Sequence, residues 1–335
     1  TLIDFHFFNK MAADKTLDFS SFDTNLLRTV EGLGNVVIID AMMDGAAALR
    51  NDFAVRTMRD KAALVSVEFQ DAFKAASDSF EGRKGATIRS RYVSFTEGDI
   101  DIEIKMSDVK ELYRSYLGWI IAPDRSEAEI RDNPFEVFFI RRIIANHFAF
   151  IRTKTAWKGA INNANIGANN IADGLLVKTA ASRTSGEIVA SHVFTAATTI
   201  DVTNAYDQVN GVADLIKSTR PEMLNMELEC KLSQSVYDLY RKNRRALFSQ
   251  HVGPGEKPTE LDDYSNIKFK IDPGLAGKST IMVTPHDNLV FAGNEDPGTY
   301  YINIVRQVKS WQLTVRVSLA FDFASPDLIF LNDKV

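Results

Sequence analysis

The chain has 335 residues, of which 45% are hydrophobic, and this is enough apolar material for one large core or two smaller ones. Charged residues make up 25% and the formal net charge is −5, which argues against wholesale disorder and against a strongly basic nucleic-acid reader. The single cysteine, Cys230, excludes an internal disulfide, and we expect it to be a small buried hydrophobe. We expect neither a membrane span nor a signal peptide.

The N-terminal residues 1–37 have no clear periodicity and predict an extended arm with an aromatic patch at Phe5–Phe8. The segment from Ile39 to about Met58 is rich in Ala, Leu and Met, and this composition predicts a short helix.

Three strand candidates follow, at Ala63–Phe69, Thr87–Phe95 and Ile100–Met106. In the third, isoleucines alternate with charged residues, and Glu97-Gly98-Asp99 predicts a turn before it. A flap of two or three such strands is marginal alone. Its apolar face must therefore pack on the body of the protein or on a neighbouring subunit.

A helix is expected at Val109–Leu117, and a longer one begins after Asp132-Asn133-Pro134, which is a strong helix start. The longer helix ends at Gly159, so that its roughly 25 residues would span about 37 Å. An Asn- and Gly-rich loop comes next. Beyond it we expect helices and strands to alternate, with helices at Val202–Ser218 and Ser233–Phe248 and strands at Met226–Leu232, Ile267–Ile271, Ser279–Thr284 and Leu289–Phe291.

The C-terminal segment Trp311–Phe323 alternates apolar and smaller or polar residues without a break. This period of two predicts one long strand with a single buried face, spanning roughly 40 Å. We expect that face to pack on the long helix, and the opposite face, which carries Arg316 and Asp322, to meet solvent or a neighbour.

Motifs for catalysis or cofactor binding are weak, and we expect no cofactor and no metal. Gly32-Leu33-Gly34-Asn35 lacks the strand and third glycine of a dinucleotide fingerprint. No two of the five histidines are spaced by three or four residues, so no zinc site is indicated. Pro285-His286-Asp287-Asn288 is interpreted as a turn, because adjacent residues rarely orient each other for catalysis.

The densest basic run is Tyr240–Arg245, at the end of an expected helix, where cations complement the helix dipole. Its alternative role is contact with an acidic neighbouring subunit or weak, non-specific contact with nucleic acid. The candidate intersubunit contacts are Arg83, Lys84 and Arg89 in the flap, and Arg241, Arg244 and Arg245 in this run.

The order of these elements resembles the major capsid proteins of tailed bacteriophages with the Hong Kong 97 (HK97-like) fold. The resemblance rests on the helix Pro134–Lys158, on the segment WKGAINNANIGANNIADGLL, and on the closing TPHDNLVFAG…WQLTVRVSLAFDFASPDLIF. It implies an α+β fold in five regions: an arm and short helix (1–60), an extended β-hairpin loop (61–106), a peripheral domain with a spine helix at about 134–158 (107–165), an axial domain (166–300) and a returning long strand (301–335). The start at Thr1 is compatible with a cleaved N-terminal scaffold segment and equally with other origins.

The function that this resemblance implies is non-enzymatic. Copies would assemble into hexamers and pentamers of an icosahedral head that encloses double-stranded DNA, in the virion, after assembly in the host cytoplasm. Its partners would be other copies and, beyond them, portal, scaffold, head-completion and decoration proteins, but no membrane. Two alternatives stay open: an encapsulin-type or gene-transfer-agent shell, and an α/β enzyme with a β-rich insertion.

Overall fold

The computed structural model describes residues 19, 22–26, 28, 49–58, 63–69, 86–122, 126–132, 134–162, 164, 165, 167–248, 256–294 and 301–334. The chain divides into two compact units. The first comprises Thr1–Gly45, Gly98–Phe148 and Pro297–Val317, and the second comprises Ala46–Glu97, Ala149–Asp296 and Ser318–Val335. Each unit therefore draws on three separate stretches of sequence.

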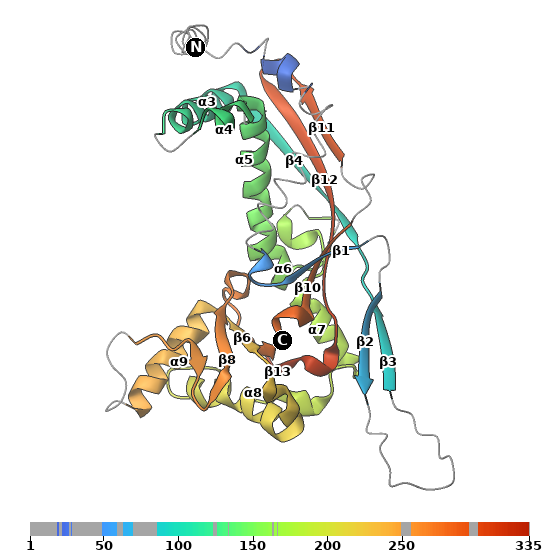
Figure 1. Cartoon of the computed structure of the whole chain (residues 1–335), viewed down its shortest axis with the longest axis vertical. Helices are drawn as coiled ribbons and strands as arrows, with labels where there is room; N and C mark the ends of the chain where they lie inside the picture. Colours follow the sequence, from blue (N-terminus) through green and yellow to red (C-terminus); the bar gives the residue numbers. More distant parts are fainter. Residues whose placement is uncertain are drawn as a thin grey trace. The chain divides into compact units, whose positions relative to one another are not determined.

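In the first unit, the N-terminal part of the long strand β12 (Ser310–Phe323) pairs with β11 (Tyr301–Arg306) and with β4 (Thr96–Lys105). Helices α3 (Met106–Ile120), α4 (Glu127–Asp132) and α5 (Phe135–Phe150) belong to the same unit (Figure 1). The long strand expected at Trp311–Phe323 is confirmed. So is the helix start after Pro134, since the Phe138 amide donates to the Pro134 carbonyl at 3.0 Å.

An aromatic cluster holds α5 to β12 in the first unit. The ring of Phe22 lies 5.6 Å from Phe139 and 5.7 Å from Trp311, so it fills the space between helix and strand. Residues 22–26 are helical, which corrects the expectation of an irregular arm over that short stretch. The physical reason is that burial of Phe22 and Leu26 stabilises a helical turn that no local sequence pattern predicts.

The polar face of β4 is paired rather than free. Asp99, Asp101 and Glu103 alternate along the strand and contact side chains of β12. The carboxylate of Asp99 accepts two hydrogen bonds from Arg316, at 2.7 and 2.9 Å. Thr314 donates to Asp101 at 2.8 Å, and Ser310 donates to Glu103 at 2.7 Å. The expected turn at residues 97–99 is therefore wrong, because these residues continue the strand. Arg316 meets solvent as expected, since its side chain is 46% exposed, and it is also paired with Asp99 within the chain.

The second unit contains a mixed sheet of six strands in the order β5-β13-β9-β6-β8-β7. Helices α8 (Ala205–Thr219) and α9 (Gln234–Leu247) pack their apolar faces on this sheet. Among the buried side chains of these faces are Val209, Ile216 and Tyr240. The strands are β5 (Val193–Phe194), β6 (Leu228–Leu232), β7 (Glu260–Leu261), β8 (Tyr264–Ile271), β9 (Ile281–Thr284) and β13 (Phe330–Asn332).

The link β6-α9-β8 joins two parallel strands through a helix, the usual solution for a parallel pair. Ser233 caps α9 by accepting a hydrogen bond from the Val236 amide. The two helices and four strands expected between residues 202 and 291 are thus confirmed, with bounds that differ by a few residues. Cys230 is fully buried in β6, as expected, and burial raises the pKa of its thiol.

A second group of strands in this unit joins β1 (Ala54–Met58) in parallel to β10 (Leu289–Asn294), and β10 in antiparallel register to the C-terminal half of β12. Of the expected helix Ile39–Met58, residues 39–48 lie outside the described residues, and the expectation is wrong over the last eight residues, because 51–53 form a turn and Ala54–Met58 form β1. The reason is a non-local pairing with β10, which overrides the local helix propensity of the segment.

The expected long helix ends at Gly159, as predicted, but it is not uniform. After α5, residues Ile151–Thr155 form a π-helical turn, and α6 (Ala156–Lys158) completes the run. Within the second unit, Trp157 is fully buried beside Phe53, with ring centroids 6.0 Å apart. A Cβ at Gly274 would meet the Trp157 ring at 2.4 Å, so only glycine fits there. Helix α7 (Leu175–Thr184) follows the Asn-rich loop, at a place where no helix is expected from the sequence.

The turn expected at Pro285–Asn288 is confirmed as a short 3-10 helix, His286–Asn288. The buried side chain of Asn288 shows why the turn contains an asparagine. Its amide nitrogen Nδ2 donates to the Thr284 hydroxyl and to the Ser325 carbonyl, both at 3.0 Å, and its oxygen Oδ1 accepts from the Ser325 backbone amide at 2.7 Å. One side chain thereby ties the end of β9 to the segment after β12.

Candidate functional site

The strongest candidate for a functional surface is the two-stranded hairpin of β2 (Ala63–Phe69) and β3 (Ala86–Tyr92). It forms a sheet of its own, separate from the other two sheets, as Figure 1 shows. The flap expected from the sequence is therefore present with two strands. The third expected strand, β4, pairs with β12 instead.

The hairpin register sorts its residues onto two unlike faces. Directly paired residues share a face, and one face collects Ala63 with Tyr92, Val65 with Ser90, Val67 with Ile88, and Phe69 with Ala86. The opposite face collects Leu64 with Arg91, Ser66 with Arg89, and Glu68 with Thr87. The first face is apolar at seven of its eight positions, and the second is mostly polar.

The apolar face is the exposed one. Val65 is 58% exposed, Ile88 is 70% exposed and Tyr92 is 65% exposed. The polar face turns inward at its described positions, since Leu64 is buried with Val93 against Val290, Ala292 and Ala320. This is the reverse of the usual arrangement of a half-buried sheet, in which the apolar face is covered. An apolar face of this kind on an isolated ribbon marks an interaction surface.

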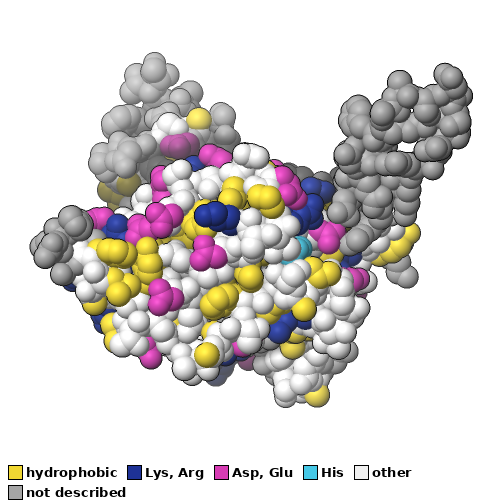
Figure 2. All heavy atoms as spheres, turned by 90° about the horizontal axis from the view of Figure 1, so that it is seen from below, with side chains coloured by type: hydrophobic (Ala, Val, Ile, Leu, Met, Phe, Trp, Pro, Cys, Tyr) yellow, Lys and Arg dark blue, Asp and Glu magenta, His cyan; other side chains and the backbone are white. Residues whose placement is uncertain are grey.

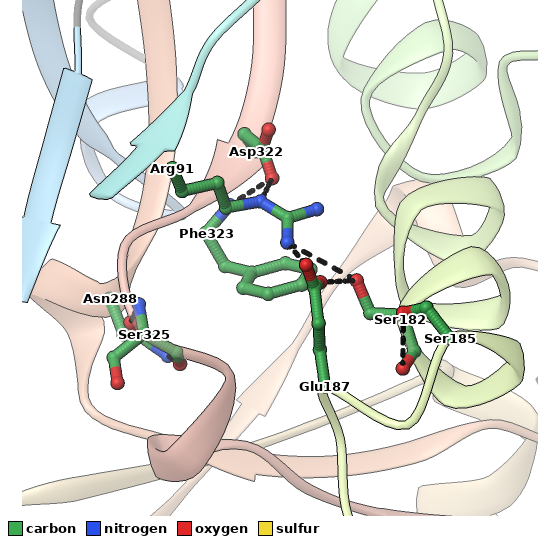
Figure 3. Close-up of polar contacts among 8 residues, drawn as sticks. All are labelled: Arg91, Ser182, Ser185, Glu187, Asn288, Asp322, Phe323 and Ser325. Carbon is green, nitrogen blue, oxygen red and sulfur yellow. Dashed lines mark hydrogen bonds and ion pairs between the residues drawn. The ribbon is translucent and has the colours of Figure 1, made fainter. Parts of the chain in front are cut away.

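Arg91 holds the base of the hairpin by four contacts (Figure 3). Its Nε donates to Asp322 Oδ1 at 2.7 Å. One terminal nitrogen donates to Glu187 Oε2 at 2.6 Å and to the Ser182 hydroxyl at 3.2 Å. The guanidinium carbon lies 4.1 Å from the centre of the Phe323 ring, within cation–π range.

The Arg91 contact overturns one expectation. Asp322 was expected to face solvent or a neighbouring subunit, but it is 3% exposed and paired within its own chain. Arg91 itself is not among the residues expected from the sequence to form a site. The available signal was a charged residue on a strand whose paired partner, Leu64, is apolar. The carboxylates that it binds lie 96 and 231 residues away, so no local pattern reveals them.

The flap residues among the candidate intersubunit contacts stay predictions. Arg83 and Lys84 lie outside the described residues, and so does the side chain of Arg89, whose backbone belongs to β3. The register places Arg89 on the polar face of the hairpin, two residues before Arg91.

The basic run on α9 divides into paired and exposed members. Arg244 donates to Asp262 at 2.6 Å and to Glu256 at 2.9 Å, and these hydrogen bonds raise its pKa. Arg241 donates to the Glu256 carbonyl at 3.2 Å and lies 3.8 Å from Asp238. Arg245 is exposed. Two of the three arginines thus hold their own unit together, and an intersubunit contact of Arg245 stays a prediction.

The described histidines do not gather into a catalytic or metal cluster. His192 is buried and stacks on Phe330 with ring centroids 4.1 Å apart, and His286 lies 3.2 Å from Glu229 in the turn after β9. His147 lies on α5, whereas His6 and His251 are outside the described residues. Over the part of the chain that the structure describes, no group of three His, Cys, Asp or Glu side chains could hold a metal ion.

Charge does not concentrate on the face drawn in Figure 2, where basic, acidic and apolar side chains are interspersed.

A surface groove of about 750 Å³ is lined by the end of α7 and the segment that follows it, including Arg183, Ile188, Val189 and Val193. None of the helices built from described residues combines the length and the apolarity needed to cross a membrane.

Comparison with solved structures identifies the fold of the chain. The sequence matches no protein-family model and no curated protein. Among solved structures, the chain is similar over its whole length to a chain of the "Satellite phage P4 procapsid including size determination (Sid) protein". The TM-score is 0.53 and the identity 12%, with 97% of that chain covered. It is also similar to the "Capsid of native GTA particle", at 12% identity and a TM-score of 0.49, with 86% of this chain and 89% of that chain covered.

The P4 procapsid match carries the conclusion about architecture. At 12% identity it establishes the fold alone, but it does so from one end of the chain to the other. The α+β phage-capsid fold expected from the sequence is confirmed.

Proposed function

We propose that this chain is the shell-forming major capsid subunit of a tailed phage. Copies assemble through heterologous contacts into pentamers and hexamers, which close an icosahedral shell around packaged double-stranded DNA. The protein acts by assembly and not by catalysis. Its place is the virion, after assembly in the host cytoplasm, and portal, scaffold and decoration proteins are its further partners.

A fold does not by itself define a function, so the proposal needs an observation at a site. That observation is the exposed apolar face of the β2–β3 hairpin at Val65, Ile88 and Tyr92. A second copy of the same chain is the occupant that a capsid fold supplies, because every subunit of a shell is surrounded by identical neighbours. Covering these side chains removes apolar surface from water and favours association.

Assembly of the purified chain tests the proposal directly. The full chain would be examined over a range of concentrations by size-exclusion chromatography with light scattering, followed by negative-stain electron microscopy. We expect rings of five and six subunits or closed particles, with a fraction that rises with concentration. A chain that stays monomeric at every concentration contradicts the proposal.

A further inference from the structure

We propose that Arg91 is the positioning residue that fixes the direction of the β2–β3 hairpin, so that the apolar face of the hairpin is presented in one orientation. The inference rests on the proposed function for its consequence in assembly. The positioning itself rests on contacts within the second unit and is measured separately.

Arg91 lies beside an apolar anchor of the hairpin. Arg91 is directly paired with Leu64, one pair in from the Ala63–Tyr92 pair that ends the ribbon. Leu64 packs into the small apolar cluster with Val290, Ala292 and Ala320. Such a contact is non-directional, because apolar burial depends on area and not on angle. A ribbon held by Leu64 alone would keep its base in place and still pivot.

The contacts of Arg91, in contrast, are directional. The guanidinium is a planar fork whose donors have fixed directions, so it is held at a defined angle when several acceptors surround it. Asp322 accepts at Nε, Glu187 and Ser182 accept at the same terminal nitrogen, and the ring of Phe323 lies against the guanidinium carbon (Figure 3).

These partners come from different segments: Asp322 and Phe323 end β12, Ser182 belongs to α7, and Glu187 follows that helix. The guanidinium of Arg91 therefore fixes strand β3 relative to two independent elements of the unit.

The groups that accept from Arg91 are themselves held in place. Asp322 is buried, and its Oδ1 also accepts from the Phe323 amide at 2.9 Å. The Ser182 hydroxyl donates to Glu187 Oε2 at 2.7 Å, so the two acceptors of the terminal nitrogen are bound to each other. A lysine could supply the charge at this position but not the planar fork. The arrangement thus calls for arginine and not merely for a cation.

The test must separate positioning from folding, because removing Arg91 alone leaves the Asp322 carboxylate buried and unpaired. The paired variant Arg91→Met/Asp322→Asn removes the contact and the buried charge together. Arg91→Lys keeps the charge and removes the fork. Arg114→Met, on the exposed side of α3, is the matched control.

Cys230 is buried, so spin labels can be directed to new cysteines at two exposed positions, Ile88→Cys and Ala181→Cys. Electron–electron distance measurements on unassembled full chain then report the hairpin direction relative to α7. We expect one narrow distribution with native Arg91 and with Arg114→Met. Broader distributions are expected in Arg91→Lys and in the paired variant, together with hydrogen exchange in β2 and β3 that is about tenfold faster.

Unchanged widths and unchanged exchange in both Arg91 variants would overturn the proposal. Broadening in chains that keep the native thermal transition would support it. Assembly supplies the second arm: variants with a loosened hairpin should form fewer or irregular particles. If the unaltered chain itself forms no particles, the proposed function fails, whereas the distance measurement still decides the role of Arg91.

Discussion

The ammonium group of Lys231 donates a 2.6 Å hydrogen bond to the backbone carbonyl of Asp52. Its side chain is completely buried, and Glu229 Oε2 lies 2.8 Å from the same nitrogen. The side chain of Asp52 in turn pairs with Arg152 at 2.5 Å. A turn that precedes β1 is thereby bound from β6 and from the π-helical segment, and these contacts fix three elements of the second unit together.

We expect Lys231→Met to destabilise the second unit by about 3 kcal/mol, because it removes the ammonium partner of the half-buried Glu229 and leaves the Asp52 carbonyl without its donor. Lys268→Met is the matched control: Lys268 pairs with Glu227 at 3.0 Å on the surface. Its loss should cost no more than about 0.5 kcal/mol. Denaturant unfolding measures both, and equal effects would show that the buried pair is not structurally important.

The apolar hairpin face leads to a prediction about assembly. Ile88→Glu places a charge where a neighbouring subunit would bury the side chain, and desolvating an unpaired charge is costly. We expect assembly to be abolished, while the free energy of unfolding of the subunit changes by less than about 0.5 kcal/mol because Ile88 is exposed. Sedimentation and thermal unfolding measure the two quantities.

Val308→Glu makes the same chemical change at an exposed apolar residue between β11 and β12, and it serves as the control. Particle formation by Val308→Glu and not by Ile88→Glu is the expected pattern. Normal particles from Ile88→Glu would remove the hairpin face from the interface.

The arginines of α9 are expected to behave differently despite being adjacent. Arg244→Ala breaks hydrogen bonds to Asp262 and Glu256 and should destabilise the second unit by about 1–3 kcal/mol. Arg245→Ala should leave stability unchanged, because its side chain is exposed. An effect of Arg245→Ala on particle yield alone would support its role between subunits. The opposite ranking of the two variants in denaturant unfolding would contradict the assignment.

The long strand shows both the reach and the limit of the sequence pattern. Period-two alternation predicted β12 to within one residue, because one face is apolar throughout. The pattern did not reveal that Ser318, Ala320 and Asp322 are buried as well. A signal was present: in the exposed half of the strand the intervening residues include Gln312 and Arg316, and in the buried half they are smaller. Small residues on the second face permit another layer to approach.

Non-local pairing explains the remaining errors. Ala54–Met58 is a strand because β10 lies beside it, and β10 is more than two hundred residues away in sequence. Likewise, Arg91 is defined by partners from α7 and β12. Local propensity and periodicity identify elements, but they carry little information about which distant element supplies a pairing edge or a counter-charge. The hairpin was therefore predictable as a flap, whereas the contacts that hold it were not.

His192 supplies a prediction about pH. Burial lowers the pKa of this imidazole, and the nearby Asp327 only partly offsets that effect. In the unfolded chain a histidine titrates near pH 6.5, so below that pH the unfolded state binds more protons than the folded one. Stability should therefore decrease as the pH falls from about 7 to about 5, by no more than about 1.4 kcal/mol per pH unit from this group.

His192→Phe keeps an aromatic ring against Phe330 and removes the titrating group. Between about pH 7 and pH 5, we expect the unfolding free energy of the variant to depend less steeply on pH than that of the unaltered chain. At higher pH the two proteins should have the same slope. Denaturant titrations at several pH values measure this difference. Identical slopes in the two proteins between about pH 7 and pH 5 would assign the acid sensitivity to other groups.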